Sequence, residues 1–232
     1  MNDQRELGEL VADPAASPAP LPGPFVGKHV TLVAFDPPVH GPPLFEEIKN
    51  APQLWDYMLS GPFQDAGAYV AALHRMLETL NLYAILDNHA PQPGLAVKGH
   101  LALMRMDLPN RVGEVGTVLF APSFQRSIGS TECIFLVMQT AFEDLKLRRF
   151  EWKCNSLNVA SNRAALRLGF TFEGTFRKHM LLKGRNRDTN WYSIIDDDWP
   201  ILKAVFTKWL ADDNFDDGRQ KKSLAEVRQS LP

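Results

Sequence analysis

Apolar residues recur along the first half of the chain in short runs bounded by proline, glycine or polar clusters. This pattern predicts β-strands. The predicted strands are His29–Phe35, Leu82–Leu86, Gly99–Arg105 and Gly113–Phe120. The proline-rich stretch Pro37–Pro43 is expected to break the chain after the first strand, and Leu44–Asn50 and Asp65–Leu80 are expected to be helical.

The apolar spacing changes to a helical period from Thr131 onward. Ser130 or Thr131 is suited to cap the start of this helix, and Glu132 suits its positive end. The elements predicted after it are the strand Phe150–Cys154, the helix Val159–Leu168, paired strands Phe170–Lys183 and Asp188–Ile195, and a last helix from Asp196–Asp198 to near Trp209–Leu210. This order predicts a mixed sheet with helices packed on it, an α/β or α+β fold.

The composition places most of these elements in one domain. The chain has 232 residues, of which 45% are hydrophobic and 22% charged, as in ordinary globular proteins. Residues 1–25 are rich in proline and alanine and are expected to form a flexible arm. Residues 26–211 are expected to form the domain, and residues 212–232 a frayed polar tail.

Net charge and cysteine content limit the partners and the compartment expected for this protein. The net charge of −2 argues against nucleic acid as a constitutive partner, and the apolar runs are too short for a membrane helix. The first residues, MNDQREL, do not resemble a secretory signal. Cys133 and Cys154 lack metal-binding spacing and are expected to be reduced core residues. A cytoplasmic protein without a metal site is therefore expected.

The loop Gln125–Thr131 is the strongest candidate for binding a ligand. It joins a strand to a helix, and the first amide groups of a helix have no intrahelical acceptors and lie at its positive end. Gly129 is the residue expected to adopt a positive φ, and Arg126 adds a charged fork of donors. Ser127, Ser130 and Thr131 add hydroxyl groups. The loop matches neither marked nucleotide motif, so an ordinary strand–helix turn is the alternative on local pattern alone.

Two longer stretches, Glu114–Glu132 and Phe150–Ser193, resemble the GNAT acetyltransferases, in particular the RimJ/RimL-type branch that acetylates protein N-termini and small amines. Leu54–Phe63 also resembles that branch, and the likeness covers roughly residues 26–210. The resemblance implies the GNAT acyl-CoA N-acyltransferase fold, a mostly antiparallel twisted sheet flanked by helices. It also implies acetyl-CoA as co-substrate.

The resemblance assigns roles to two motifs. The loop Gln125-Arg126-Ser127-Ile128-Gly129-Ser130 corresponds to the family's pyrophosphate-binding loop, and the preceding strand, near Leu119 and Phe120, to the one that holds the pantetheine arm. The second motif appears as Asn158-Val159-Ala160-Ser161, followed by Gly169-Phe170. It implies that Asn158 reaches the pantetheine and that Ser161 lies near the sulfur, although both side chains also suit purely structural roles in the first turn of a helix.

The catalytic groups implied by the resemblance are incomplete. Ala165 stands where many GNAT enzymes have a tyrosine that acts as the general acid toward the CoA thiolate. Its absence leaves Ser161 as the candidate acid. Met180 stands where the ribosomal-protein member has a proposed glutamate base, which leaves the neighbouring His179 as the best base by residue type. Backbone amides near Leu119–Phe120 are the expected donors to the carbonyl oxygen.

The acceptor pocket is expected to involve Tyr57, Trp55, Phe63, Glu114 and His179, although core packing is the alternative for the three aromatic residues. Asp188 is expected to fix the hairpin or to pair with Arg185 or Arg187. The predicted function is acetyl transfer from acetyl-CoA to a primary amine, either a small metabolite or a peptide N-terminus. A non-catalytic acyl-CoA-binding protein is the alternative. Either a monomer or a homodimer is compatible with the sequence.

Overall fold

The computed structural model describes residues 7–92, 94 and 96–231. Within these residues, eight strands form one sheet in the order β1-β2-β3-β4-β5-β6-β8-β7. Its strands are β1 Phe25–Val26, β2 Val30–Ala34, β3 Asn81–Asp87, β4 Val97–Asp107, β5 Val112–Phe120, β6 Arg149–Asn155, β7 Thr171–Leu182 and β8 Arg185–Ile195. Neighbouring strands are antiparallel except β5 and β6, which are parallel. The expected mostly antiparallel mixed sheet is confirmed.

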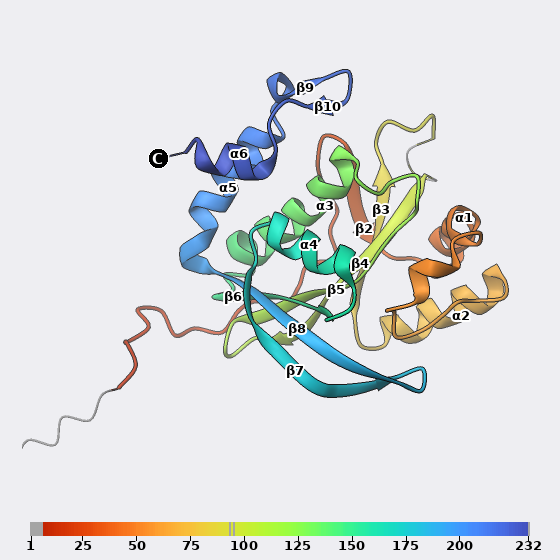
Figure 1. Ribbon diagram of the computed structural model, residues 1–232, viewed down its shortest axis with the longest axis horizontal. Helices are drawn as coiled ribbons and strands as arrows, with labels where there is room; N and C mark the ends of the chain where they lie inside the picture. Colours follow the sequence, from red (N-terminus) through yellow and green to blue (C-terminus); the bar gives the residue numbers. More distant parts are fainter. Residues whose placement is uncertain (1–6, 93, 95, 232) are drawn as a thin grey trace, which may run out of the picture.

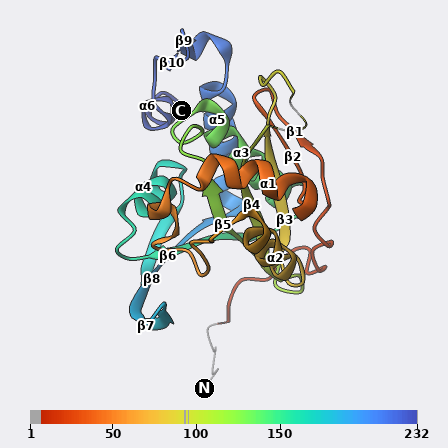
Figure 2. The ribbon, with the colours of Figure 1, turned by 90° about the vertical axis from the view of Figure 1, so that its right-hand side faces the viewer.

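The helices are α1 Pro37–Ile48, α2 Ala66–Leu77, α3 Ile128–Gln139, α4 Val159–Arg167, α5 Trp199–Trp209 and α6 Leu224–Gln229. Figure 1 shows α1 and α2 packed together beside one half of the sheet, and β7–β8 extending from the other half as a long twisted hairpin. Figure 2 shows the C-terminal elements gathered at the end opposite this hairpin.

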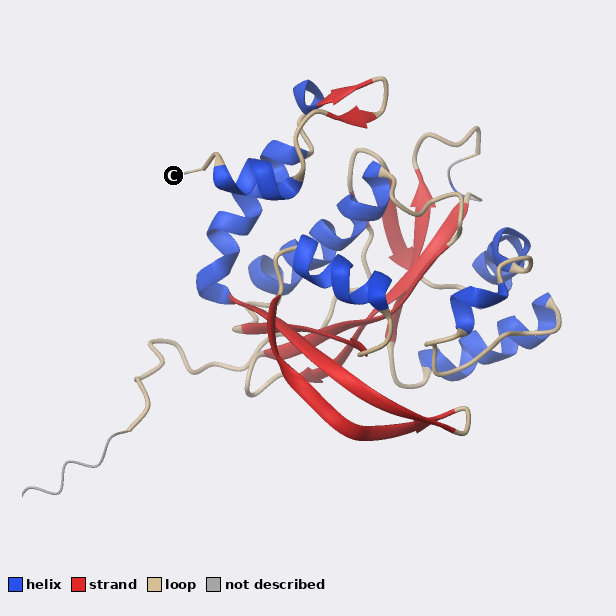
Figure 3. Cartoon of the chain, viewed as in Figure 1, coloured by secondary structure: helices blue, strands red, loops and turns tan. Residues whose placement is uncertain are grey.

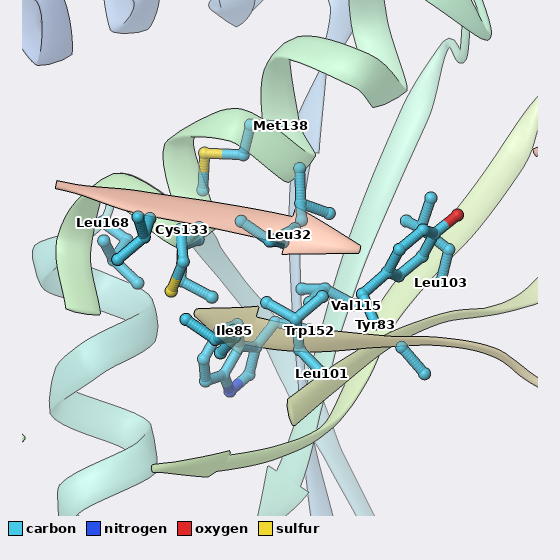
Figure 4. Packing of buried hydrophobic residues seen from close by; sticks show 14 of the residues in the cluster. Leu32, Tyr83, Ile85, Leu101, Leu103, Val115, Cys133, Met138, Trp152 and Leu168 are labelled. Atoms are coloured by element: carbon cyan, nitrogen blue, oxygen red, sulfur yellow. The ribbon is translucent and has the colours of Figure 1, made fainter. Parts of the chain in front are cut away.

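The hydrophobic core lies between the sheet and its helices. Side chains from β2, β3, β4, β5 and α3 converge there, among them Leu32, Ile85, Leu101 and Cys133 (Figure 4). Helix α3 is buried on most of its circumference, because strands lie along one side and α5 packs on another. The start of this helix is therefore held in a fixed position relative to the sheet.

A buried carboxylate fixes the start of β2 to α3. Glu132 is 5% exposed, and its two oxygens accept hydrogen bonds from the backbone N–H groups of Lys28, His29 and Val30 at 2.9, 2.7 and 3.0 Å. The sequence suggests a helix-dipole role for Glu132, whereas the structure adds a cross-link between two distant segments.

The prediction that Pro37–Pro43 breaks the chain is wrong, because α1 begins at Pro37. Proline is tolerated in the first turn of a helix, where its missing N–H has no intrahelical acceptor. Pro42 and Pro43 lie further along the same helix. A cluster of prolines marks the start of a helix here rather than a loop.

The two terminal segments are more ordered than expected. In the arm, the Ser17 hydroxyl donates to the Leu145 carbonyl at 2.6 Å, and the Tyr83 hydroxyl donates to the Leu21 carbonyl at 2.5 Å. The prediction of a frayed tail is wrong for residues 212–231, which form a small hairpin and α6. Its strands, β9 Phe215–Asp216 and β10 Arg219–Gln220, stand apart from the main sheet (Figure 3). Leu224 and Val227 of α6 are buried in the core, which explains why this mostly polar segment folds.

Candidate active site

Strands β5 and β6 separate in the middle of the sheet. Their parallel pairing covers Val112–Glu114 of β5 and then stops, while β6 continues to pair with β8 as far as Asn155. A cavity of about 1280 Å³ opens there and extends to the start of α3. It is lined by the second half of β5, the end of β6, the first turns of α3 and α4, and the middle of the β7–β8 hairpin.

The start of α3 forms one end of this cavity. The helix begins at Ile128 and its N-cap is Ser127, whose hydroxyl oxygen accepts from the Ser130 N–H at 3.0 Å. The prediction of Ser130 or Thr131 as the cap is therefore wrong by about one turn. With the Ser130 N–H held by this cap, the N–H groups of Ile128 and Gly129 have no acceptors within the helix and remain available to an anion.

The positive φ in this loop belongs to Arg126, at 61°, and not to Gly129 as expected. Gly129 instead allows close packing: a Cβ there would lie 2.8 Å from the Phe124 ring and 2.9 Å from a Val30 methyl group. The absence of a side chain at Gly129 thus allows α3 to pack closely against Phe124 and Val30 in the core. Arg126 is exposed at the cavity wall.

The other predicted loop residues line the cavity, Gly129 excepted, but several already have partners. The Ser130 hydroxyl donates to the Ser127 carbonyl at 2.7 Å, and Gln125 Nε2 donates to the Phe120 carbonyl at 3.3 Å. Thr131 Oγ1 accepts from Arg167 Nη1 at 3.1 Å. Arg167, which no sequence motif singled out, therefore brings a second cation beside the start of α3.

The end of β5 presents its backbone in alternating directions. The Leu119 carbonyl faces β4, because a Cβ on Gly99 would lie only 2.2 Å from it. The N–H and C=O groups of one strand residue face the same neighbouring strand. Of the two expected amide donors, the Leu119 N–H therefore faces β4, whereas the Phe120 N–H faces the open side.

Helix α4 carries the second predicted motif. Asn158 is its N-cap, since its side-chain oxygen accepts from the Ser161 N–H at 3.0 Å. The Ser161 hydroxyl oxygen accepts from the Trp152 indole N–H at 3.0 Å. Both Asn158 and Ser161 line the cavity. Because the indole supplies a proton to that oxygen, the proton of the Ser161 hydroxyl is left to be donated elsewhere.

Asn162, which no sequence motif singled out, joins α4 to the sheet. Its side-chain amide nitrogen donates to the carbonyls of Asn155, Ser156 and Asn158, at distances from 2.7 to 3.2 Å. Its oxygen accepts from Asn190 and from the Tyr192 hydroxyl at 2.7 and 2.6 Å. These bonds hold the first turn of α4 over the end of β6.

A bulge in β7 places His179 at the cavity. The register between β7 and β8 shifts between Phe176 and Met180, and Lys178 has a φ of 51°. Asp188 accepts from the Lys178 N–H at 2.7 Å, so it fixes the hairpin rather than pairing with an arginine. The imidazole Nδ1 of His179 lies 2.9 Å from Thr189 Oγ1. When Nδ1 carries the proton and donates to Thr189, Nε2 is left as an acceptor.

Glu114 lies in the cavity wall as part of an ionic cluster. It is 5% exposed, and its carboxylate lies 2.9 Å from Lys153 Nζ and 3.5 Å from Arg105 Nε. Lys153 also pairs with Glu151 at 2.6 Å. Burial raises the pKa of Glu114, and the two neighbouring cations act against that change.

Of the three predicted aromatic pocket residues, Tyr57 lines the cavity and the others do not. Trp55 is 4% exposed and stacks edge-on against Phe63, with ring centroids 5.1 Å apart. Phe63 also contacts Tyr69 in the core. Trp55 and Phe63 therefore pack against each other and the core, which is the alternative that the sequence left open for them.

The C-terminal segment reaches the cavity beside the start of α3. Trp209 and residues of the β9–β10 hairpin, including Arg219, line its wall there.

Cys154 lines the cavity too, and burial raises the pKa of its thiol, which keeps the group protonated and unreactive at neutral pH. Over residues 7–92, 94 and 96–231, no group of three metal-binding side chains comes together. None of the helices in this part of the chain combines the length and the hydropathy that a membrane span needs.

Comparison with known proteins identifies the family. Residues 29–171 match the model of the acetyltransferase (GNAT) domain, which is typical of RimJ/RimL-like enzymes. The chain belongs to the GNAT family of N-acetyltransferases. Its fold matches the crystal structure of a GCN5-related N-acetyltransferase from Brucella melitensis with a TM-score of 0.88 and 38% identity, covering 93% of this chain and 98% of that one.

A second crystal structure, of a probable GNAT-family acetyltransferase from Chromobacterium violaceum, matches this GNAT enzyme with a TM-score of 0.79 and 33% identity, over 86% of this chain and 100% of the other. YoaA of Bacillus subtilis, described as an uncharacterized N-acetyltransferase, is 36% identical over 86 residues, which are 37% of this chain. The chain spans about half the length of the curated relatives it matches, 48% in the case of YoaA. GNAT enzymes use acetyl-CoA as the acetyl donor.

Proposed function

We propose that this GNAT enzyme acetylates a primary amine, on a small metabolite or a peptide N-terminus, by direct transfer from acetyl-CoA while both substrates are bound. The observation that carries the proposal is the separation of β5 from β6 after Glu114. This separation exposes backbone donors of β5 in a cavity that also contains the start of α3 and Ser161.

The residues present suit coenzyme A. The free N–H groups in the first turn of α3, together with Arg126, suit its diphosphate, because both supply positive charge and N–H donors to phosphate oxygens. The unpaired edge of β5 suits the amide groups of the pantetheine arm. The bound thioester would supply an acetyl group already activated for transfer.

The transfer itself needs three contributions from the chain. The Phe120 amide stabilises the negative charge that develops on the carbonyl oxygen. Ser161 donates its proton to the sulfur as the carbon–sulfur bond breaks, so that CoA leaves as the thiol, and the serine oxygen regains a proton from solvent. His179, through Nε2, accepts the proton that the amine nitrogen loses on forming its new bond to carbon. Glu114 is a second candidate for this role, acting through water. Holding both substrates in one cavity supplies much of the rate enhancement.

Calorimetric titration with coenzyme A and a thiol-release assay with acetyl-CoA and a panel of amines test the proposal. We expect micromolar binding and release of CoA that depends on the amine. Arg126→Gly should weaken CoA binding about tenfold, since a charged hydrogen bond is lost while the left-handed backbone is retained.

Arg111→Gly is the matched control, because Arg111 has a φ of 55° in the β4–β5 turn and does not line the cavity. Binding without turnover on any amine would contradict the catalytic proposal and leave an acyl-CoA-binding protein. Absence of CoA binding would contradict both.

A further inference from the structure

Arg187 on β8 is a buried cation with no acidic partner. The residue is 9% exposed, and its recorded side-chain hydrogen bond runs from Nε to Thr189 Oγ1 at 3.1 Å. Among the described residues, no carboxylate oxygen lies within 4.0 Å of its guanidinium nitrogens. Burying an unpaired charge is costly. Burial accordingly lowers the pKa of Arg187.

The neighbouring cations differ from Arg187 in this respect. Lys153 pairs with Glu114 and Glu151, and Arg105 pairs with Glu114. Arg149 pairs with Glu151 and with Glu173. Arg187 lies close enough to this cluster for the charges of Glu114 and Arg105 to act on its pKa. Counted with it, the four cations Arg105, Arg149, Lys153 and Arg187 face three carboxylates, those of Glu114, Glu151 and Glu173. One positive charge is left over, and it is carried by the residue without an ion pair.

Arg187 lies in the part of the cavity wall that also contains His179 and Thr189. It lines the cavity wall and pairs with Met180 across the hairpin, just beyond Thr189, which pairs with the last residue of β6. The Thr189 hydroxyl oxygen contacts both Arg187 Nε and His179 Nδ1. The unpaired guanidinium is therefore one hydroxyl group away from the candidate base.

We infer that the acceptor amine carries a carboxylate and that Arg187 binds it. This inference rests on the proposed function and makes the substrate a small amino acid-type amine. The planar fork of the guanidinium matches the two oxygens of a carboxylate. A single unmatched positive charge suits a monoanion, whereas the dianionic charge of a phosphate would face Glu114 and Glu151 without compensation.

The test compares acceptor pairs that differ only in the anionic group: glycine, β-alanine, 4-aminobutyrate and phenylalanine, each against its carboxamide. With the wild-type enzyme, kcat/KM should favour at least one carboxylate over its carboxamide. Arg187→Met should reduce this preference about 30-fold, mainly by lowering kcat/KM for the carboxylate. Comparing the ratios in a double-mutant cycle cancels the different amine basicities of the two acceptors.

Arg185→Met is the matched control, because Arg185 is exposed on the same strand, and it should leave the preference unchanged. CoA titration shows whether each variant is folded. A wild-type enzyme without a preference for any carboxylate, or a preference that survives Arg187→Met, would overturn the inference.

Should CoA bind but no amine react, the proposed function fails and binding decides the inference separately. In the presence of CoA, the same carboxylates should then raise the Tm of the wild type and not of Arg187→Met. Equal shifts, or none, would contradict the role of Arg187.

Discussion

The indole N–H of Trp152 on β6 donates a hydrogen bond to the Ser161 hydroxyl oxygen on α4, across 3.0 Å. The Ser161 N–H is held in turn by the Asn158 side chain. The hydroxyl is therefore oriented from two sides at the mouth between β5 and β6. This arrangement suits a group that must donate a proton in one direction.

Replacing Ser161 by alanine removes this proton donor. We expect Ser161→Ala to lower kcat roughly a hundredfold, with little change in the KM for acetyl-CoA, because general acid catalysis contributes on that scale. Trp152→Phe should lower kcat less, since it removes the orienting bond and leaves the hydroxyl. Ser156→Ala, nearby but outside the cavity wall, is the control for steady-state kinetics. Full activity of Ser161→Ala would show that the serine only fills space.

A methyl group at Gly129 should disturb the start of α3. Gly129→Ala forces the Phe124 ring or Val30 to move, because its Cβ would lie within 2.9 Å of both. We expect a loss of about 1–3 kcal/mol in the free energy of unfolding and weaker CoA binding, measured by denaturation and calorimetry. Gly174→Ala on β7 meets nothing within 4 Å and should be neutral. Unchanged stability and CoA binding in Gly129→Ala would refute this account of the motif glycine.

Removing the Glu132 carboxylate should destabilise the junction between β2 and α3. Glu132→Ala leaves three backbone N–H groups without their acceptor in a buried site. We expect a loss of about 3 kcal/mol in the free energy of unfolding, measured by urea denaturation. Glu78→Ala is the control, since Glu78 is exposed at the end of α2. A change below about 0.5 kcal/mol in Glu132→Ala would contradict the cross-linking role.

His100 should make the fold sensitive to acid. It is fully buried, packs against Phe35 and Tyr69, and burial lowers its pKa to about 4. The unfolded chain has the ordinary value of about 6.5. A lowered folded pKa means that stability is fully present above pH 6.5 and is lost as the pH falls toward 4.

Each pH unit in this range changes the free energy of unfolding by at most about 1.36 kcal/mol, so His100 should lower that free energy by about 2 kcal/mol between pH 6.5 and pH 5. His100→Met should remove that part of the pH dependence of unfolding, whatever its stability at pH 7. His74→Met, exposed on α2, should leave the dependence as in the wild type. An identical pH dependence in wild type and His100→Met would show that other groups cause the acid sensitivity.

The sequence determined what is encoded locally. The periods of apolar residues predicted the central strands and the helices α2, α3 and α4, and the motif around Asn158 predicted the first turn of α4. Hydrophobic period and capping chemistry act over a few residues, so they can be read along the chain. The polar tail misled because two buried residues, Leu224 and Val227, suffice to dock α6.

Only the tertiary structure decided which of these groups meet and in which direction they face. The separation of β5 from β6 depends on pairing between segments far apart in the chain. The orientation of the Leu119 backbone depends on its register with Gly99 of β4. Whether Arg187 has an acidic partner depends on where every neighbouring carboxylate lies. Strand register and ion pairing are set by long-range packing, which no local pattern encodes.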